Sequence, residues 1–491
     1  MTTRLANRDL WLLGLTCALA LVLRLWQLNA SLWYDEVLTL TDFVRLPLKG
    51  IVTTYSSLNN HVFFSLQAHV STAIFGESTW ALRLPAVILG VATVPVLFAL
   101  VRQIGAPVVW AHVTAVLLAA NYHHIWFSQN ARGYSGLIFW CLLATIAFVA
   151  GGQRRAVAPW VWFSLASAAA LYTHLSAAFY IASLGVIYLL LWPVARRAPS
   201  PQTIGYGSAL PLICVPVTIA IIAALYSPMV PQMITAFSAV AAPTAEIATE
   251  AVPVWRNPLW TLTEVLRSAP LPLPVTLLIT PVLLAILAMG FAAIWRLNRA
   301  VALALPVSIA LTMLALVAGG MRLWPRYFLI DLPFMLLLAT AGTAALAGFI
   351  GKRFGGANAL KATGWALGIA ASLLWASRNY VSPKQDFLGA VAMVNAQAQP
   401  GDIRASFGLA ARPLSTYFAP DWTVISSVTD LDLALASGHP VWVVYAFKDH
   451  SRGTYPDLMA RMDESFVEVA SLPGTLGGGY VQVLRSNFVN D

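Results

Sequence analysis

The sequence DLWLLGLTCALALVLRLWQLNASLWYDE, residues 9–36, decides the fold class. Residues 9–28 are almost entirely apolar, and an α-helix of about 20 such residues is long enough to cross the hydrocarbon core of a bilayer. The run ends in polar residues, and two adjacent carboxylates, Asp35 and Glu36, follow it. The segment therefore predicts a membrane span with an acidic pair at its mouth.

The same pattern recurs along the chain. Together with 9–28, apolar runs near 80–101, 107–121, 135–150, 158–173, 175–194, 205–226, 271–295, 300–318, 327–350 and 363–381 give eleven predicted spans. Of the 491 residues, 59% are hydrophobic and 10% are charged, whereas about a quarter of the residues of a soluble domain are charged. We therefore expect residues 1–381 to form a membrane all-α domain, a polytopic bundle of about eleven transmembrane helices.

The charges predict how this bundle is oriented. Short connections at every second turn carry arginine or lysine, as at Arg154 and Arg155, and basic residues in short loops remain cytoplasmic. The two long loops, about 29–79 and 227–270, then lie outside, and they hold seven of the nine acidic residues before residue 382. An odd number of spans also places the C-terminus outside.

Residues 382–491 differ in composition from the bundle. They contain seven Lys and Arg and eleven Asp and Glu. Thr423–Ile425 and Val441–Tyr445 are typical of strands, and Asp386–Ala398 and Tyr455–Asp463 of helices. We expect a small soluble α/β domain on the outer side.

The remaining composition excludes other classes of protein. The net charge of +9 arises from basic residues dispersed between apolar runs, so the expected partner is the lipid bilayer and not a nucleic acid. Cys17, Cys141 and Cys214 all lie within apolar runs, which indicates neither a disulfide framework nor a zinc site.

The acidic pair is the first candidate for chemistry. Partial burial raises the pKa of a carboxyl group and makes it a better base near neutral pH. The alternative is that Asp35 and Glu36 only mark the water boundary. The loop continues amphipathically to Asn59-Asn60-His61, which predicts a helix lying in the membrane interface, as a floor for a lipid-linked substrate.

Arginines at two other outer connections are candidate phosphate ligands. Arg132 follows Ser128-Gln129-Asn130-Ala131 at a span boundary, where it could bind a phosphate or extend to lipid headgroups. Arg322 and Arg326 precede a late span; the alternative for Arg326 is a structural pair with Asp331.

Histidines and acidic residues leave the question of a metal open. His123-His124 could bind a metal, but no carboxylate stands at ligand spacing in the sequence. Asp430-Leu431-Asp432 has the spacing of a metal-binding motif of nucleotide-sugar enzymes, and this spacing often arises by chance. His174, between two spans, is typical of a hydrogen-bonded interfacial residue.

Four segments in order give the chain a resemblance to the GT-C superfamily of glycosyltransferases, of the protein O-mannosyltransferase and aminoarabinose-transferase type. They are Asp35-Glu36, Asn60-His61-Val62-Phe63-Phe64, Glu77-Ser78-Thr79-Trp80-Ala81-Leu82-Arg83-Leu84-Pro85, and Ser128-Gln129-Asn130-Ala131-Arg132-Gly133-Tyr134, with Pro325-Arg326-Tyr327-Phe328 before a late span. The resemblance covers about residues 9–350. Asn130 stands where the family has an acid, and Val37-Leu38-Thr39 stand where many relatives have Arg-Tyr.

The resemblance implies a function. Such enzymes transfer a sugar from a polyprenyl-phosphate donor to a glycan, lipid or protein acceptor on the outer face of the inner (plasma) membrane. It implies Asp35 as the catalytic base of an inverting transfer, with Glu36 beside it. The residues implied to bind substrate are His61, Gln129, Arg132, Tyr134, Arg322, Arg326 and Tyr327. The resemblance implies no certain cofactor, and it leaves open whether the protein binds a divalent metal.

A transporter or flippase of a lipid-linked glycan is the alternative function. Transporters usually place ionisable groups near the membrane midplane and often contain inverted repeats. The spans of this chain are nearly free of charge and its acidic residues lie in the outer loops, which favours the transferase.

Overall fold

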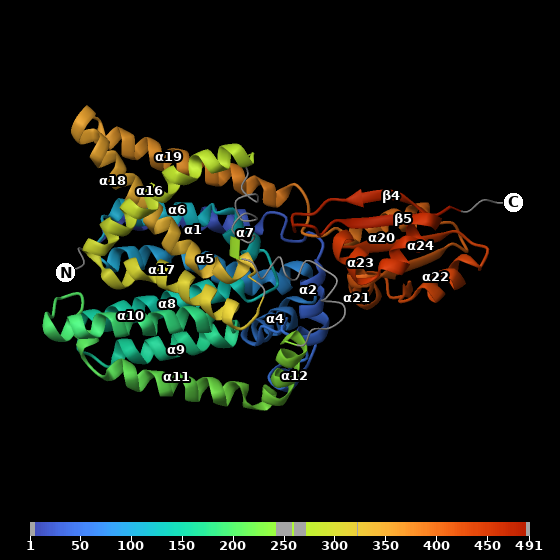
Figure 1. Cartoon of the computed structure of the whole chain (residues 1–491), viewed down its shortest axis with the longest axis horizontal. Coiled ribbons are helices and arrows are strands. Elements are labelled where there is room, and N and C mark those ends of the chain that lie inside the picture. The colour runs from blue at the N-terminus through green and yellow to red at the C-terminus, as the bar shows by residue number, and fades with distance from the viewer. Residues whose placement is uncertain (1–4, 242–257, 260–271, 322, 488–491) are drawn as a thin grey trace.

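The computed structural model describes residues 5–241, 258–259, 272–321 and 323–487. Helices gather into a bundle at one end of an elongated molecule, and a sheet covered by helices forms the other end (Figure 1). The N-terminal helix begins at the far end of the bundle, away from the sheet. Arg322 and the acidic residues Glu246, Glu250 and Glu264 lie outside the described residues.

Each of the eleven predicted spans coincides with a helix of the described residues. These helices are α1 (Asn7–Leu25), α5 (Thr79–Gln103), α6 (Val108–Ala119), α8 (Tyr134–Gln153), α9 (Ala158–Thr173), α10 (Ala177–Arg197), α11 (Leu210–Tyr226), α16 (Leu273–Leu297), α17 (Arg299–Ala318), α18 (Leu332–Phe354) and α19 (Ala357–Ala376). Within the described residues, eight helices are long and apolar enough to cross a membrane. α6 and α9, with 12 and 16 residues, are shorter, and α1 carries Arg8, Asp9 and Arg24. The count of eleven spans therefore remains a prediction.

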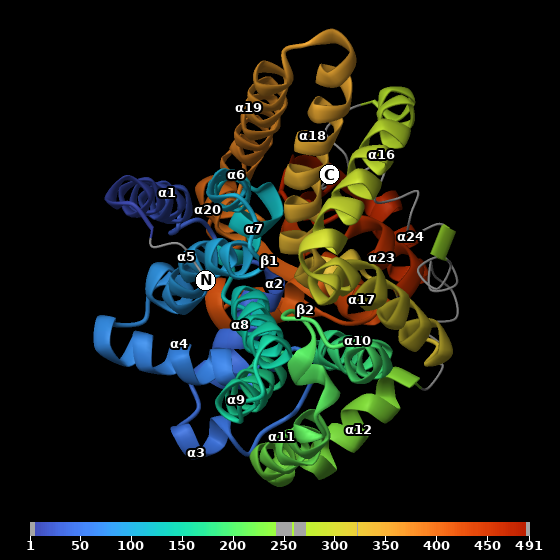
Figure 2. The same cartoon turned by 90° about the vertical axis from the view of Figure 1, so that its left-hand side faces the viewer.

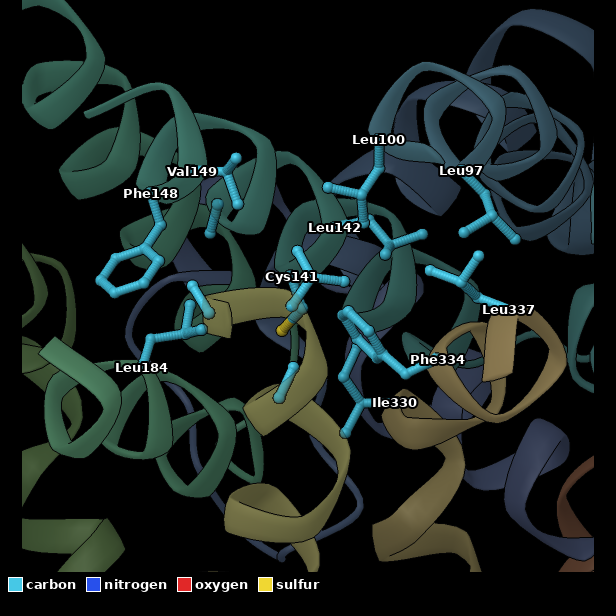
Figure 3. Packing of buried hydrophobic residues seen from close by; sticks show 14 of the residues in the cluster. Leu97, Leu100, Cys141, Leu142, Phe148, Val149, Leu184, Ile330, Phe334 and Leu337 are labelled. Atoms are coloured by element: carbon cyan, nitrogen blue, oxygen red, sulfur yellow. The ribbon is translucent and has the colours of Figure 1, made fainter. Parts of the chain in front are cut away.

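The core of the bundle lies around α8. Cys141 and Leu142 of this helix pack between Leu97 and Leu100 of α5 and Phe334 of α18 (Figure 3). Viewed along the bundle, α5, α8, α10 and α17 occupy the centre, and α19 and α11 lie at the periphery (Figure 2). Cys17, Cys141 and Cys214 are free thiols.

α16 and α18 pack with their backbones in contact. A Cβ atom at Gly290 would collide with the carbonyl oxygen of Leu338, and one at Gly342 would collide with the carbonyl oxygen of Ile286. Small residues allow this close approach, which is a common basis of helix association in membranes.

Gly342→Val should therefore destabilise the bundle. The new side chain would force α16 and α18 apart, and overpacking of this kind typically costs about 1–3 kcal/mol. The control is Gly348→Val on the same helix, because a Cβ atom at Gly348 meets no atom within 4 Å. Thermal unfolding in detergent should show a lower apparent Tm for Gly342→Val alone; equal Tm values would contradict the prediction.

Short helices occupy the connections on the side of the sheet. They are α2 (Tyr34–Thr39), the π-helical turn η1 (Leu40–Val44), α3 (Leu48–Ile51), α4 (Val62–Phe75), α7 (Tyr122–Ser128), α12 (Val230–Ala241) and the 3-10 helix η4 (Pro325–Asp331). The prediction of one interfacial helix between the acidic pair and His61 is wrong. The segment is broken into three short helices. Phe43 and Ile51 are fully buried inside the protein, whereas Leu48 is 54% exposed.

The C-terminal part contains a mixed five-stranded sheet in its described residues. The strands β1 (Ile403–Phe407), β2 (Thr423–Ile425), β3 (Val441–Ala446), β4 (Phe466–Leu472) and β5 (Val481–Ser486) have the order β2-β1-β3-β5-β4. β1 pairs in parallel with β2 and β3, and β5 pairs antiparallel with β3 and β4. The strands at 423–425 and 441–446 lie where the sequence predicted them.

Helices cover both faces of this sheet. They are α20 (Phe387–Gln397), α21 (Ala411–Pro413), α22 (Val428–Leu435), α23 (Lys448–Thr454) and α24 (Pro456–Ser465). Alternate residues of a strand face opposite sides, so Trp442 and Val444 pack in the core with α20, and Val443 and Tyr445 pack in the core with α22 and α24. All of β3 is therefore buried.

Candidate active site

Asp35 lies in the first turn of α2, where a carboxylate interacts favourably with the helix dipole. Its Oδ2 atom lies 2.5 Å from Nη1 of Arg132, and its side chain is 18% exposed. Arg132 belongs to the connection between α7 and α8, almost a hundred residues away in the sequence. The structure thus joins a carboxylate and a guanidinium that the sequence placed at two separate connections.

Glu36, the neighbour of Asp35, is directed into the protein. Successive residues of an α-helix point about 100° apart, and the Glu36 side chain is completely buried. Its oxygens accept hydrogen bonds from Nε and Nη2 of Arg83, at 2.7 and 2.6 Å, and from the backbone N–H of Ala131 at 2.7 Å. Burial alone would raise the pKa of Glu36, but Arg83 and then Lys384 hold it below its ordinary value.

Arg83 makes this pair part of a larger junction. Its guanidinium also donates to the carbonyl oxygens of Leu28, Ala30 and Ser31, at 2.7, 2.9 and 3.1 Å. The segment between α1 and α2 is therefore attached to α5 by one buried arginine. Glu36 accordingly supports the position of Asp35 from inside the protein and does not face the space in front of it.

His61 and Arg132 present donors to the same space. The backbone N–H of Gly133 donates to Nδ1 of His61 at 2.7 Å, so in the neutral ring the proton is on Nε2. Nε2 lies 3.3 Å from Nη2 of Arg132, and a guanidinium has no acceptor to offer. Arg132 also donates to the side-chain oxygen of Asn59. An anion that lies beside both atoms would accept a hydrogen bond from the Nε2–H and another from the guanidinium.

The electrostatics agree with a neutral His61. Burial, followed by the charges of Arg132, His174 and Arg326, holds the pKa of His61 well below its ordinary value. The ring of His174 lies 4.5 Å from that of His61, and burial with the two arginines lowers the pKa of His174 to about 3. Nδ1 of His174 accepts a hydrogen bond from the N–H of Ser176 at 3.1 Å, as expected for a hydrogen-bonded residue between two spans.

Arg326 reaches this group from η4. Asp35, Tyr134 and Tyr327 lie close enough to interact with its charge, and its guanidinium lies 5.2 Å from the centre of the Trp324 ring. The alternative pairing of Arg326 with Asp331 does not form. Asp331 is buried, and neither of its carboxylate oxygens is hydrogen-bonded within the described residues.

A pocket of about 160 Å³ lies beside Arg326. Its walls are mainly aromatic, and its lining includes Trp33, Trp126, Phe127, Tyr134, Trp324 and Arg326. The rings form a continuous series, with centroid separations of 5.9 Å for Trp33–Trp126, 4.8 Å for Trp126–Phe127 and 4.6 Å for Phe127–Tyr134. The structure therefore combines carboxylate, guanidinium groups and an aromatic pocket at one end of the bundle.

Gln129 is not directed toward this pocket. Its side-chain N–H₂ donates to the carbonyl oxygens of Arg24 and Trp26, at 3.1 and 2.6 Å, which anchors the end of α1. The backbone carbonyl oxygen of Gln129 accepts a hydrogen bond from Nζ of Lys384 at 2.6 Å. Burial and the charge of Arg83 lower the pKa of Lys384 to about 7, although Glu36 opposes this.

The residues considered for a metal have other partners. Nδ1 of His124 lies 2.6 Å from Nη2 of Arg24. Asp430 accepts backbone hydrogen bonds at the start of α22, and Asp432 pairs with Arg461. Among residues 5–241, 258–259, 272–321 and 323–487, no three His, Cys, Asp or Glu side chains come together as ligands.

Comparison with solved structures identifies the architecture. The chain aligns with ArnT from Cupriavidus metallidurans bound to undecaprenyl phosphate, with a TM-score of 0.50, 14% identity and coverage of 96% of this chain and 97% of that chain. The same protein in the apo state gives a TM-score of 0.51 at 16% identity, over 97% and 98% of the two chains. The chain has the GT-C fold.

Two further comparisons add to this structural similarity. The archaeal oligosaccharyltransferase AglB from Archaeoglobus fulgidus, in complex with an inhibitory peptide and a dolichol-phosphate, gives a TM-score of 0.53 at 12% identity, over 97% of this chain and 74% of that chain. A profile of the family described as dolichyl-phosphate-mannose-protein mannosyltransferase matches residues 62–220. No curated protein matches the sequence. At these identities the structural matches establish the fold alone.

Proposed function

We propose that this GT-C protein is an integral-membrane glycosyltransferase that moves a sugar from a polyprenyl-phosphate donor to an acceptor hydroxyl. The acceptor belongs to a glycan, a lipid or a protein. The single observation that carries the proposal is the Asp35–Arg132 ion pair, which lies beside His61 and Arg326 and next to the aromatic pocket. This set contains a base, cations for a phosphate and rings for a sugar.

The chemistry follows from these groups. Asp35 accepts the proton of the acceptor hydroxyl while that oxygen bonds to the anomeric carbon, and the bond from this carbon to the phosphate oxygen breaks. The polyprenyl phosphate leaves as an anion, so no acid is needed to protonate it. Arg132 and Arg326 stabilise the charge that accumulates on it. A single displacement inverts the anomeric configuration.

The ion pair also explains how the base becomes available. Before the donor binds, the carboxylate of Asp35 is held by Arg132 at 2.5 Å. A donor phosphate that accepts hydrogen bonds from Arg132 and His61 replaces this partner and releases Asp35 for the acceptor. Proton transfer is thereby coupled to the presence of the donor.

Sidedness is inferred from the helix connections. The site residues come from the connections α1–α5, α6–α8 and α17–α18, at the end of the bundle that faces the sheet. Arg102, Arg154, Arg196 and Arg296 lie at the opposite ends of their helices. Since basic short loops stay in the cytoplasm, we place the site and the C-terminal sheet on the outer face of the inner membrane.

The proposal is tested with the full-length protein in detergent. A deletion strain should accumulate the unused donor, and its lipid extract serves as substrate. The protein, given this extract and the acceptor fraction, should release free polyprenyl phosphate, which mass spectrometry detects. A flippase would release none, because detergent contains no bilayer to cross. Absence of released polyprenyl phosphate would overturn the transferase.

A further inference from the structure

The aromatic pocket has one wall that does not belong to the bundle. Leu476, in the turn between β4 and β5, lines it together with Trp126, Trp324 and Arg326. The turn contains Gly477-Gly478-Gly479, which lacks the Gly-Lys-Ser/Thr ending of a phosphate loop. A residue near the C-terminus therefore completes a site whose other walls come from the membrane bundle.

The turn is held firmly in this place. Oγ1 of Thr475 accepts a hydrogen bond from the indole N–H of Trp126 at 3.0 Å. The backbone N–H groups of Thr475 and Leu476 donate to the carbonyl oxygens of Pro383 and Lys384, at 3.0 and 3.2 Å. Gly474 is required by this approach, because a Cβ atom there would collide with the carbonyl oxygen of Lys384. The turn that carries Leu476 is thus held by Trp126 of the bundle and by the backbone of residues 383–384.

The same region of the C-terminal part holds the helix that carries Asp35. The side chain of Gln385 is fully buried, accepts a hydrogen bond from the N–H of Tyr34 at 2.9 Å and donates to the carbonyl oxygen of Gly479 at 3.3 Å. One buried side-chain amide, that of Gln385, therefore contacts both the helix that carries Asp35 and the β4–β5 turn. The distance between the base and the wall at Leu476 is set by the C-terminal part of the chain.

The lining of the pocket restricts which class of ligand fits it. The lining includes Arg326, and the remaining lining is mostly aromatic. Aromatic walls with few polar groups orient a bound molecule by shape. A sugar attached to a phosphate combines a ring, which suits these walls, with an anion, which suits Arg326. Leu476 has no polar group, so it discriminates between sugars by volume.

We propose that Leu476 is a specificity-determining residue, and that the β4–β5 turn closes the subsite for the donor sugar. The inference rests on the proposed function, since it assumes a polyprenyl-phosphate donor. An aliphatic wall distinguishes ligands by about 10–200-fold per methylene-sized group. A larger side chain at 476 should therefore exclude the sugar and leave the site for the lipid phosphate intact.

The test compares lipids with and without a sugar on the full-length protein in detergent. The probes are undecaprenyl phosphate and its mannose-, glucose- and arabinose-bearing forms, and native mass spectrometry measures their binding. In Leu476→Trp the affinity for every sugar-bearing form that the wild type binds should fall by about tenfold or more, with affinity for undecaprenyl phosphate within twofold. Leu476→Ala should improve the affinity for the hexose forms relative to the arabinose form.

The control is Leu433→Trp, at an exposed position of α22 in the same part of the chain, which should change none of the affinities. Equal loss for all four lipids in Leu476→Trp, or no loss for any, would overturn the inference. So would a wild-type protein that binds undecaprenyl phosphate but no sugar-bearing form. A wild type that does not bind undecaprenyl phosphate would instead overturn the proposed function.

Discussion

Asp35→Asn should abolish sugar transfer while the protein still folds and still binds the lipid phosphate. Asparagine has nearly the same size as aspartate but cannot accept the proton of the acceptor hydroxyl, and loss of a general base typically lowers the rate by about 10²–10⁴-fold. Since the variant no longer holds Arg132 with a charge, undecaprenyl phosphate should bind as tightly as before or more tightly. Polyprenyl phosphate release and lipid binding, measured on the same preparation, check both results.

Glu77→Gln is the matched control. Glu77 lies in the same long loop and also pairs with an arginine, Arg45, at 2.7 Å. Unlike the Asp35 pair, this pair is open to water, because the side chains of Glu77 and Arg45 are 43% and 41% exposed. Its transfer rate should stay within twofold of the wild type. A transfer rate in Asp35→Asn within tenfold of wild type would remove Asp35 from the role of base. Loss of lipid binding in Asp35→Asn would show that the carboxylate acts by organising the site.

The helices of the bundle could be predicted well because their signal is local. Burial in lipid requires long apolar runs, and each run of the sequence became a helix among the described residues. The lengths were harder to predict, because polar residues end helices inside apolar stretches. Asn121 caps α7 with its side chain and separates it from α6, and His174 ends α9 after 16 residues. The loop after α2 was predicted as one interfacial helix, whereas Val44 and Ile51 of this loop pack in buried clusters of the protein.

The site was only partly predictable, because the sequence does not show which way neighbouring side chains point. Asp35 and Glu36 are adjacent and alike, yet one faces Arg132 and the other faces Arg83. In the sequence Arg83 stands within the segment Glu77–Pro85 at the start of a predicted span, and nothing in the sequence connects it to Glu36. The contributions of Lys384 and Leu476 depend on how the C-terminal part docks, which no local pattern encodes.

Glu36→Gln should destabilise the end of the bundle that faces the sheet. The substitution removes the charge that compensates Arg83, which is fully buried together with its partner. Breaking a buried ion pair by changing one partner typically costs about 3–5 kcal/mol, because the other charge remains buried without compensation. Since Arg83 also holds the carbonyl groups of Leu28, Ala30 and Ser31, the segment that positions Asp35 should loosen. A lower apparent Tm and a lower transfer rate should therefore appear together.

The exposed pair provides the comparison for the buried one. Glu77→Gln makes the same change in a pair accessible to water, where ion pairs contribute about 0.2–1 kcal/mol, so its Tm should hardly move. The pKa of Glu36 is held below its ordinary value of 4.5, so the stability from this pair is full above that pH and is lost as the pH falls through the folded-state pKa. The Tm difference between wild type and Glu36→Gln should accordingly shrink on acidification. A difference that is absent at neutral pH, or that grows toward low pH, would show that Glu36 is not the charged anchor of this loop.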